Sequence, residues 1–297
     1  MENVTNCPLC GAGDFKKKFS SKDFSLTRKE FTVVECQDCH LLFTNPRPGQ
    51  ASIGDYYKSP SYISHTNQSF GFFGKLYQAA RKRALELKLT WIKKHIELPG
   101  KLLDYGSGTG EFLNLARSKG WAVQGIEIAD EPRRASKSKY NLEVQSPSAL
   151  GNIEDQSLDV ITMWHVLEHV ADLSSVIEGV ISKLKKNGML VLALPNPDSW
   201  DANHYKEYWA AWDLPIHFYH FKKKNIEFLA SRFGLELVEI RNMPFDSYYV
   251  SLLSEGYVGG NFKWIKAAFI GFVSNVRSGG HNASSLTYIL RKSKTGA

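Results

Sequence analysis

The 297-residue sequence lacks several features, and each absence narrows what the chain can be. It has no apolar run near the roughly 18 residues that a membrane-spanning helix needs. Residues 1–5 are polar and lack the basic-then-apolar order of a secretory signal. Internal repeats and low-complexity tracts are missing as well. We therefore expect a globular protein of the cytoplasm.

Cysteine is scarce, with four residues, all of them within the first 45 positions. They form two C-x₂-C pairs, Cys7/Cys10 and Cys36/Cys39, with 25 residues between the pairs. Four thiolates complete a tetrahedral Zn²⁺ shell without an open position, which is typical of a structural site. A disulfide is disfavoured in the cytoplasm. Because so short a segment cannot bury enough core to fold alone, we expect a zinc-ribbon-like module over residues 1–45.

The excess of charge is mild, at a formal +7 with cysteines counted as neutral. Four thiolates around one Zn²⁺ would lower it to about +5. An anionic acceptor, a membrane surface or a nucleic acid would each suit such a chain, and the charge selects none of them.

Beyond the module, residues 46–70 are rich in Pro, Ser, Tyr and Asn and are expected to be a connector. A helix should follow, because apolar residues recur at spacings of three and four in Phe73, Leu76, Ala80, Ala84, Leu87 and Trp91. After Pro99-Gly100 we expect strands at 101–105, 121–127, 142–145, 158–163, 188–194, 235–242 and 285–292. Helices are expected at 110–119, 130–140, 172–186 and 222–233. This alternation predicts an α/β fold with a parallel sheet and helices on both faces.

A glycine-rich turn follows the first of these strands, in Asp104-Tyr105-Gly106-Ser107-Gly108-Thr109-Gly110. Glycines allow a sharp turn and a close approach of a ligand to the main chain, and the free N–H groups of a helix start favour a negative group. Glu127 ends the next expected strand, where a carboxylate can accept hydrogen bonds from both hydroxyls of a ribose. The G-x-G-x-x-G/A pattern of NAD sites fails in both registers, because its last position falls on Glu111 or Leu113. The alternative is an ordinary turn without a ligand, which the entropic cost of three close glycines disfavours.

The pattern D-x-G-x-G-x-G resembles motif I of class I methyltransferases that use S-adenosylmethionine (SAM), and the resemblance covers roughly residues 71–297. It implies a Rossmann-like sheet of seven strands with a reversed last strand. It also implies that Asp104, Gly106 and Gly108 line the methionine end of SAM, that Glu127 holds the ribose, and that the segment around Ala149 contacts adenine. The residues expected at the cofactor are Asp104, Tyr105, Gly106, Gly108, Gly110, Glu127, Ile128, Ala149 and Trp164.

The run Val166-Leu167-Glu168-His169-Val170 is similar to a motif that follows strand four in the same family. Relatives that act on small molecules and on quinone or polysaccharide precursors often carry it. The N/D-P-P-Y/F motif that accompanies amine methylation in this superfamily is missing. His165 and His169 lie four residues apart, a spacing that fits a metal site if the segment is helical. We favour the alternative, in which His169 is capped or packed in the core.

Two further histidines lie in Trp212-Asp213-Leu214-Pro215-Ile216-His217-Phe218-Tyr219-His220-Phe221. This D-x-P-x-H-x-x-H-F segment resembles one in bacterial methyltransferases of cell-surface or secondary-metabolite pathways. It should lie at the carboxyl edge of the sheet, where open α/β folds bind ligands. With an ordinary pKa of about 6.5, His217 or His220 can accept a proton near neutral pH, so both are candidate catalytic residues. The alternative is that both pack or hydrogen-bond structurally.

Residues 243–284 interrupt the alternation, and connections of this length are usually functional or carry structure of their own. Within them, apolar residues recur at helical spacing, and basic residues lie nearby: Phe262, Ile265, Phe269, Phe272, Val273 and Val276, with Lys263, Lys266 and Arg277. Such a helix could be a lid over the acceptor or could lie on a membrane surface. We favour a third interpretation, a helix packed on the sheet edge.

The sequence resembles two sorts of methyltransferase with an N-terminal zinc module. One modifies nucleotide-linked sugars and other glycan or metabolite precursors, and the other methylates guanine in ribosomal RNA. The exit from the module, Phe43-Thr44-Asn45-Pro46-Arg47-Pro48, and the D-x-P-x-H-x-x-H-F segment favour the first. We therefore expect methyl transfer from SAM to a hydroxyl of a small molecule, a sugar or a glycan precursor, with a structural Zn²⁺. Ribosomal RNA methylation and SAM binding without catalysis are the second and third hypotheses.

Overall fold

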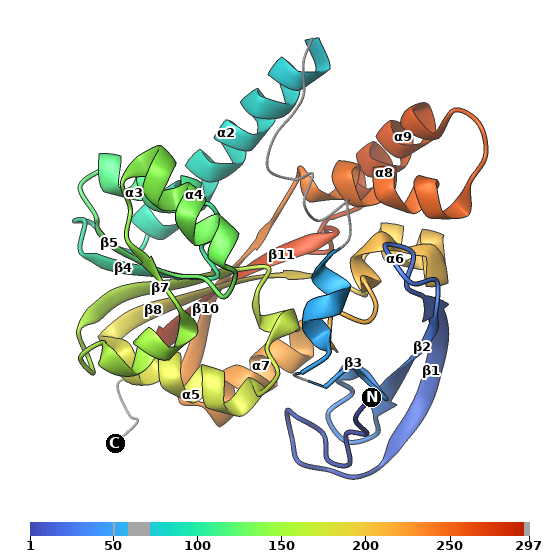
Figure 1. Ribbon diagram of the computed structural model, residues 1–297, viewed down its shortest axis with the longest axis horizontal. Coiled ribbons are helices and arrows are strands. Elements are labelled where there is room, and N and C mark those ends of the chain that lie inside the picture. Colours follow the sequence, from blue (N-terminus) through green and yellow to red (C-terminus); the bar gives the residue numbers. More distant parts are fainter. Residues whose placement is uncertain (50, 59–71, 294–297) are drawn as a thin grey trace.

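A computed structural model of the chain describes residues 1–49, 51–58 and 72–293 (Figure 1). Residues 50 and 59–70 of the expected connector lie outside the described residues, as do residues 71 and 294–297 of the expected methyltransferase domain. The side chains of Phe73 and Leu76, which belong to the expected helical pattern, lie outside the description too.

Seven strands form the central sheet in the order β10-β11-β8-β7-β4-β5-β6. Their bounds are β4 Lys101–Tyr105, β5 Ala122–Ile126, β6 Val144–Gln145, β7 Leu158–Trp164, β8 Leu184–Pro195, β10 Leu235–Asn242 and β11 Ser285–Lys292. The strands from β4 to β8 pair in parallel, and β11 runs antiparallel to both β8 and β10. The expected α/β sheet with a reversed last strand is confirmed.

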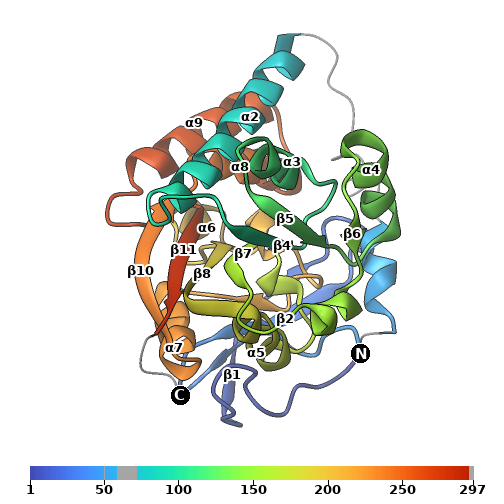
Figure 2. The same cartoon turned by 90° about the vertical axis from the view of Figure 1, so that its left-hand side faces the viewer.

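Helices cover both faces of this sheet, as the two views in Figures 1 and 2 show. One face carries α2 (Phe72–Lys93), α3 (Glu111–Ser118) and α4 (Asp130–Tyr140), and the other carries α5 (Leu173–Lys183) and α7 (Lys223–Arg232). Because both faces are covered, the central strand β8 is apolar and buried throughout residues 189–194. In the described ranges, no helix is both long and apolar enough to cross a membrane.

The expected helix at 172–186 is wrong at its end. α5 begins after Asp172, whose carboxylate accepts a hydrogen bond of 3.0 Å from the Ser175 N–H and so caps the helix. It ends at Lys183, and Leu184 already belongs to β8, where it pairs with Leu158 of β7.

The N-terminal segment forms a second sheet, in the order β1-β2-β3-β9. β1 (Phe15–Lys22), β2 (Glu30–Cys36) and β3 (Leu42–Thr44) are antiparallel neighbours. The fourth strand, β9 (Tyr219–His220), comes from the D-x-P-x-H-x-x-H-F segment, and its two residues pair with Phe43 and Leu42. The expected N-terminal module therefore shares its sheet with the segment that carries the two candidate catalytic histidines.

The two sheets also share a hydrophobic core, in which buried residues of β2 and β3 cluster with those of β8 and α7. Hydrogen bonds from α7 reach both cysteine pairs. The fully buried Asn225 donates through Nδ2 to the Cys39 carbonyl at 2.7 Å, and Arg232 donates to the Leu9 carbonyl. Loss of a buried hydrogen-bond partner typically costs about 1–3 kcal/mol, so these contacts help to fix the module on the larger sheet.

Residues 243–284 contain two helices, α8 (Asp246–Val258) and α9 (Lys263–Val276). They pack closely, because a Cβ on Gly271 of α9 would lie 2.7 Å from Cδ1 of Tyr248 on α8. α9 confirms the expected helix at 262–276. The favoured interpretation, in which this apolar helix packs on the sheet edge, is wrong for its large apolar side chains. The residues that α9 buries are Ala267, Ile270, Gly271 and Ser274. The large apolar side chains point outward, with exposed fractions of 74% for Phe262, 68% for Ile265, 64% for Phe269, 57% for Phe272 and 67% for Val276.

Candidate functional site

The glycine turn lies at the carboxyl end of β4, as expected. Gly106 has a φ of 80°, and a Cβ there would lie 2.3 Å from Cγ2 of Val166, so only glycine fits this position. Gly108 also has a positive φ, of 53°, but a Cβ on it would meet no atom of the described residues within 4 Å. Among these residues, space is therefore left beside the Gly108 backbone, which is what a ligand that approaches the main chain requires.

Glu127 follows β5 and holds this turn by hydrogen bonds. Its Oε2 accepts from the Gly108 N–H at 2.9 Å, and its Oε1 accepts from the Ala129 N–H at 3.0 Å. Parallel β4 and β5 end at the same edge of the sheet, so the turn and the acid come together as the sequence predicts. A carboxylate at this edge can also accept from the hydroxyls of a ribose.

Asp104 lies beneath the turn and is 2% exposed. Burial raises its pKa to about 7, although Thr162 lowers it by donating to Oδ1 at 2.6 Å. Lys88 of α2 provides a positive charge that also lowers the pKa of Asp104, and burial in turn lowers the pKa of Lys88. A carboxyl group with a pKa near 7 is readily ionised by a nearby cation, because the positive charge favours the carboxylate form.

The other expected cofactor residues lie around the same edge. Ile128, directly after Glu127, is 80% exposed, whereas Ala149 in the short helix Pro147–Asn152 is 8% exposed. Trp164 ends β7, with its ring 5.3 Å from Phe112 of α3 and its centroid 4.4 Å from Nζ of Lys88. Tyr105 and Gly110 belong to the turn itself.

A cluster of titratable side chains begins one residue after β7. His165 has a φ of 57°, and its ring lies between two carboxylates, with Nε2 3.1 Å from Asp246 and Nδ1 3.4 Å from Glu168. Burial lowers the pKa of His165, but the two carboxylates outweigh it and raise that pKa to about 9. The segment is not an α-helix, since only a short 3₁₀ turn spans Leu167–His169. The condition under which His165 and His169 would lie on one helix face is therefore not met.

The two candidate catalytic histidines are both buried, at 7% exposure for His217 and 3% for His220. Nδ1 of His217 is 2.9 Å from the Ala211 carbonyl, and its ring centroid lies 4.5 Å from that of His169 and 6.3 Å from that of His220. Nε2 of His220 has no hydrogen-bond partner among the described residues. Burial lowers the pKa of His220 to about 3 and that of His217 well below its usual value. Both rings are therefore neutral at physiological pH.

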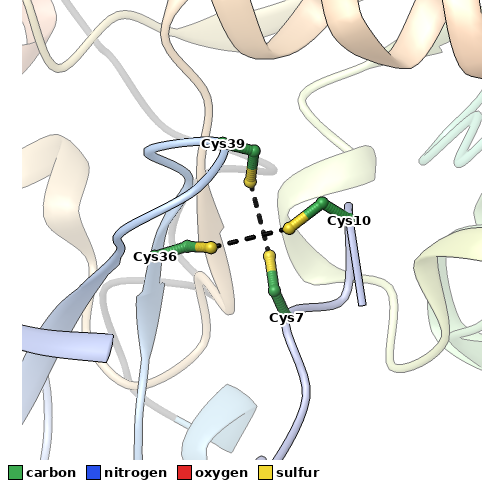
Figure 3. Close-up of side chains that lie close together, drawn as sticks. All are labelled: Cys7, Cys10, Cys36 and Cys39. Atoms are coloured by element: carbon green, nitrogen blue, oxygen red, sulfur yellow. Dashed lines mark hydrogen bonds between the residues drawn. The ribbon is translucent and has the colours of Figure 1, made fainter. Parts of the chain in front are cut away.

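The four cysteine sulfurs converge from the two pairs, as Figure 3 shows. Sγ of Cys7 lies 3.5 Å from Sγ of Cys39, and Sγ of Cys10 lies 3.5 Å from Sγ of Cys36. All four sulfurs lie within 4.8 Å of one another. Zn–S bonds of about 2.3 Å in a tetrahedron place sulfurs about 3.8 Å apart, so the arrangement fits a tetrathiolate ion.

Several residues at this edge were missed by the sequence interpretation. Asp246 lies in the long connection 243–284 and was not predicted as a site residue, although an acid in the first turn of a helix can be recognised in a sequence. Arg47 was assigned to a connector, yet its guanidinium donates to Tyr219 at 3.0 Å, to the Ala171 carbonyl at 3.0 Å and to Glu2 at 2.7 Å. No pattern in the sequence indicated that contact.

Comparisons with known proteins agree with this geometry. A family model described as a methyltransferase domain matches residues 76–240, more than half of the chain, and the chain belongs to that family. It is 30% identical over 118 residues to the ubiquinone biosynthesis O-methyltransferase of Pseudomonas fluorescens strain Pf0-1, a match that covers 37% of this chain and 51% of that protein. The chain thus spans about half the length of the curated relatives it matches.

Two solved structures show the fold. One is 1,6-didemethyltoxoflavin-N1-methyltransferase of Burkholderia thailandensis with bound S-adenosylhomocysteine, at a TM-score of 0.51 and 11% identity, over 88% of this chain and 99% of that one. The other is phosphoethanolamine N-methyltransferase 2 of Haemonchus contortus, at a TM-score of 0.53 and 16% identity. That match covers 94% of this chain and 68% of the other. The expected Rossmann-like methyltransferase fold is confirmed.

Proposed function

We propose that this chain transfers the methyl group of SAM to a hydroxyl of a small molecule, a sugar or a glycan precursor. The uncovered Gly108 backbone, held by Glu127 at the carboxyl edge of β4 and β5, carries the proposal. The similarity to an O-methyltransferase supports the choice of a hydroxyl. SAM would supply a methyl group already activated on a sulfonium sulfur, so the residues of the chain have to bind, orient and deprotonate.

The residues fit those tasks in the following way. Glu127 would accept from the ribose hydroxyls, Ile128 and Ala149 would contact the adenine, and Asp104 would face the cationic methionine end. Trp164, whose ring contacts Phe112 and Lys88, would separate the cofactor from the acceptor.

His217 and His220 stay our proposed proton acceptors. Nε2 of His220 has no hydrogen-bond partner among the described residues, so it would accept a proton in the tautomer that carries the N–H on Nδ1. So low a pKa makes His220 a weak base, so it would act on a hydroxyl that the site itself makes more acidic.

Label transfer tests this function. The protein is incubated with methyl-labelled SAM and, separately, with catechol, with a bacterial glycan and lipid extract, and with ribosomal RNA. We expect label on a hydroxyl acceptor and none on RNA. Transfer to RNA alone would favour the ribosomal alternative, and SAM binding without transfer to any of the three would favour a non-catalytic protein.

Two variants assign the roles within that assay. Glu127→Gln should weaken SAM binding about tenfold in calorimetry, because one of two acceptor oxygens is lost, while the exposed control Glu131→Gln should bind as the wild type does. His220→Gln should lower transfer by about a hundredfold or more with SAM affinity unchanged. Equal transfer by His220→Gln and the wild type would exclude His220 as the proton acceptor, and the same result for His217→Gln would exclude both histidines.

We also propose that the four cysteines bind one structural Zn²⁺, which requires the reduced thiols of the cytoplasm. Purified protein should contain about one zinc per chain by mass spectrometry of the metal, and Cys39→Ser should lose it and unfold at a lower temperature. A zinc content near zero in the wild type would contradict the assignment.

The outward face of α9 supports peripheral contact with an anionic membrane, from which a lipid-carried acceptor would be taken. Six large apolar side chains are at least 57% exposed there, and exposed basic residues flank them: Phe262, Trp264, Ile265, Phe269, Phe272 and Val276, with Lys263, Lys266 and Arg277. An apolar face with a basic border is the pattern of a helix that lies in the interface of an anionic bilayer.

Vesicle sedimentation tests that contact. The protein should pellet with phosphatidylcholine vesicles that contain phosphatidylglycerol and less with phosphatidylcholine alone. The triple change Trp264→Ser, Phe269→Ser and Phe272→Ser should lower the bound fraction at least tenfold. A matched triple change at other exposed apolar positions, Leu98, Phe228 and Val238, serves as control. Equal binding by both triples, or a stable dimer in place of vesicle binding, would contradict the proposal.

A further inference from the structure

Three metal-ligating groups meet beside the predicted acceptor segment, and the methyl-transfer proposal uses only one of them. Glu168 and His169 come from the 3₁₀ turn after β7, and His217 comes from the segment that leads into β9. One ligand atom from each lies within 4.8 Å of the others. This group is built from different residues than the four-cysteine site.

Hydrogen bonds to the main chain set the tautomers of the two histidines. Nδ1 of His169 is 3.1 Å from the Ile216 carbonyl, and Nδ1 of His217 is 2.9 Å from the Ala211 carbonyl. Nδ1 of His169 also lies 3.2 Å from the Tyr57 hydroxyl, and Nε2 of His217 lies 4.0 Å from Oδ2 of Asp213. Because a carbonyl can only accept, the two carbonyl contacts fit the tautomer in which each Nδ1 carries the proton and each Nε2 keeps a lone pair for a ligand. Histidine ligands of metals are typically held in this way, with the other ring N–H donated to a backbone carbonyl or a carboxylate.

Glu168 adds a second and independent observation. Its side chain is 1% exposed, and neither carboxylate oxygen accepts a hydrogen bond from any described residue. Its ion-pair contact is with Nδ1 of His165, at 3.4 Å. That histidine is shared with Asp246, so the two carboxylates are incompletely compensated. A buried carboxylate without hydrogen bonds is costly, and a cation would remove most of that cost.

We propose that Glu168, His169 and His217 bind one divalent transition-metal ion. Two imidazoles and one carboxylate are the donors that Mn²⁺, Fe²⁺, Co²⁺ and Zn²⁺ accept, and three protein ligands leave positions open for oxygen. Ligand atoms at about 2.1 Å from one ion lie about 3 Å apart, so binding draws the three side chains together. The ion would therefore stabilise the junction between β7 and β9.

This inference rests on the proposed function for its chemical role. An acceptor hydroxyl on an open position would become more acidic, since the ion stabilises the oxyanion. With His217 bound to the ion, His220 would be the proton acceptor that remains, and its ring centroid lies 6.3 Å from that of His217. The oxygen then forms the O–C bond with the methyl group while the S–C bond of the donor breaks, and that electron pair stays on sulfur.

Direct binding of Mn²⁺ tests the site. Zinc-loaded protein is titrated with Mn²⁺ alone, and free Mn²⁺ is followed by electron paramagnetic resonance, since Mn²⁺ prefers O and N donors over the thiolate site. We expect one Mn²⁺ per chain and a higher melting temperature. Glu168→Gln, His169→Gln and His217→Gln should each weaken Mn²⁺ binding at least tenfold. His204→Gln, at an exposed histidine of the helix Trp200–Tyr205, is the matched control.

The zinc content of each variant reports whether the variant is still folded, because the cysteine segments are hydrogen-bonded to α7 and their sheet includes β9. The same titration with Co²⁺ covers an ion that prefers nitrogen more strongly. No bound Mn²⁺ or Co²⁺, or equal binding by folded variants and the control, would overturn the proposal. Methyl transfer that persists without any such ion would leave the proposed function intact and refute the metal's role, whereas ion binding without transfer would do the reverse.

Discussion

The pairing of β3 with β9 is the constraint on which the rest of the account depends. It is only two residues long, Leu42 with His220 and Phe43 with Tyr219, but further hydrogen bonds extend it. The Thr44 N–H donates to the Phe218 carbonyl at 3.0 Å, and the Thr44 hydroxyl donates to the His217 carbonyl at 2.8 Å. The N-terminal module therefore positions the two candidate histidines, His217 and His220, and the proposed zinc site would help to hold the proposed acceptor segment.

The two halves of the site differ in what holds them. The cofactor half is fixed by the central sheet, where Glu127 and the glycine turn follow neighbouring parallel strands. The proposed acceptor half is assembled from a 3₁₀ turn, the start of α8 and the segment before β9. It buries Glu168 and His217, whose ligand atoms lie within 4.8 Å of each other, and it places the partly exposed His165 3.4 Å from Glu168. Titratable groups such as Glu168 and His217 are costly to bury, and clusters of them are typical of functional sites.

The sequence predicted the central fold well, because its strands and helices alternate and each carries a strong local pattern. The bounds of β4, β10 and β11 match the expected ranges. It did not predict β9, because a two-residue strand has no periodicity and its partner lies more than 170 residues away. It predicted α9 but not its exposure, since an apolar stripe shows which face is apolar and does not show what covers it. The proposed metal-ligand cluster was not predicted for the same reason as β9, because His169 and His217 meet only through the tertiary fold.

The most direct test is amide hydrogen exchange before and after removal of zinc by a chelator. If the four cysteines anchor β3, and β3 anchors β9, chelation should remove protection from the amides of Leu42–Thr44 and Tyr219–His220. The central strands β4, β7 and β8 should keep theirs. Unchanged exchange in β9 after complete loss of zinc would contradict the account, because the N-terminal module would then have no part in holding the acceptor segment.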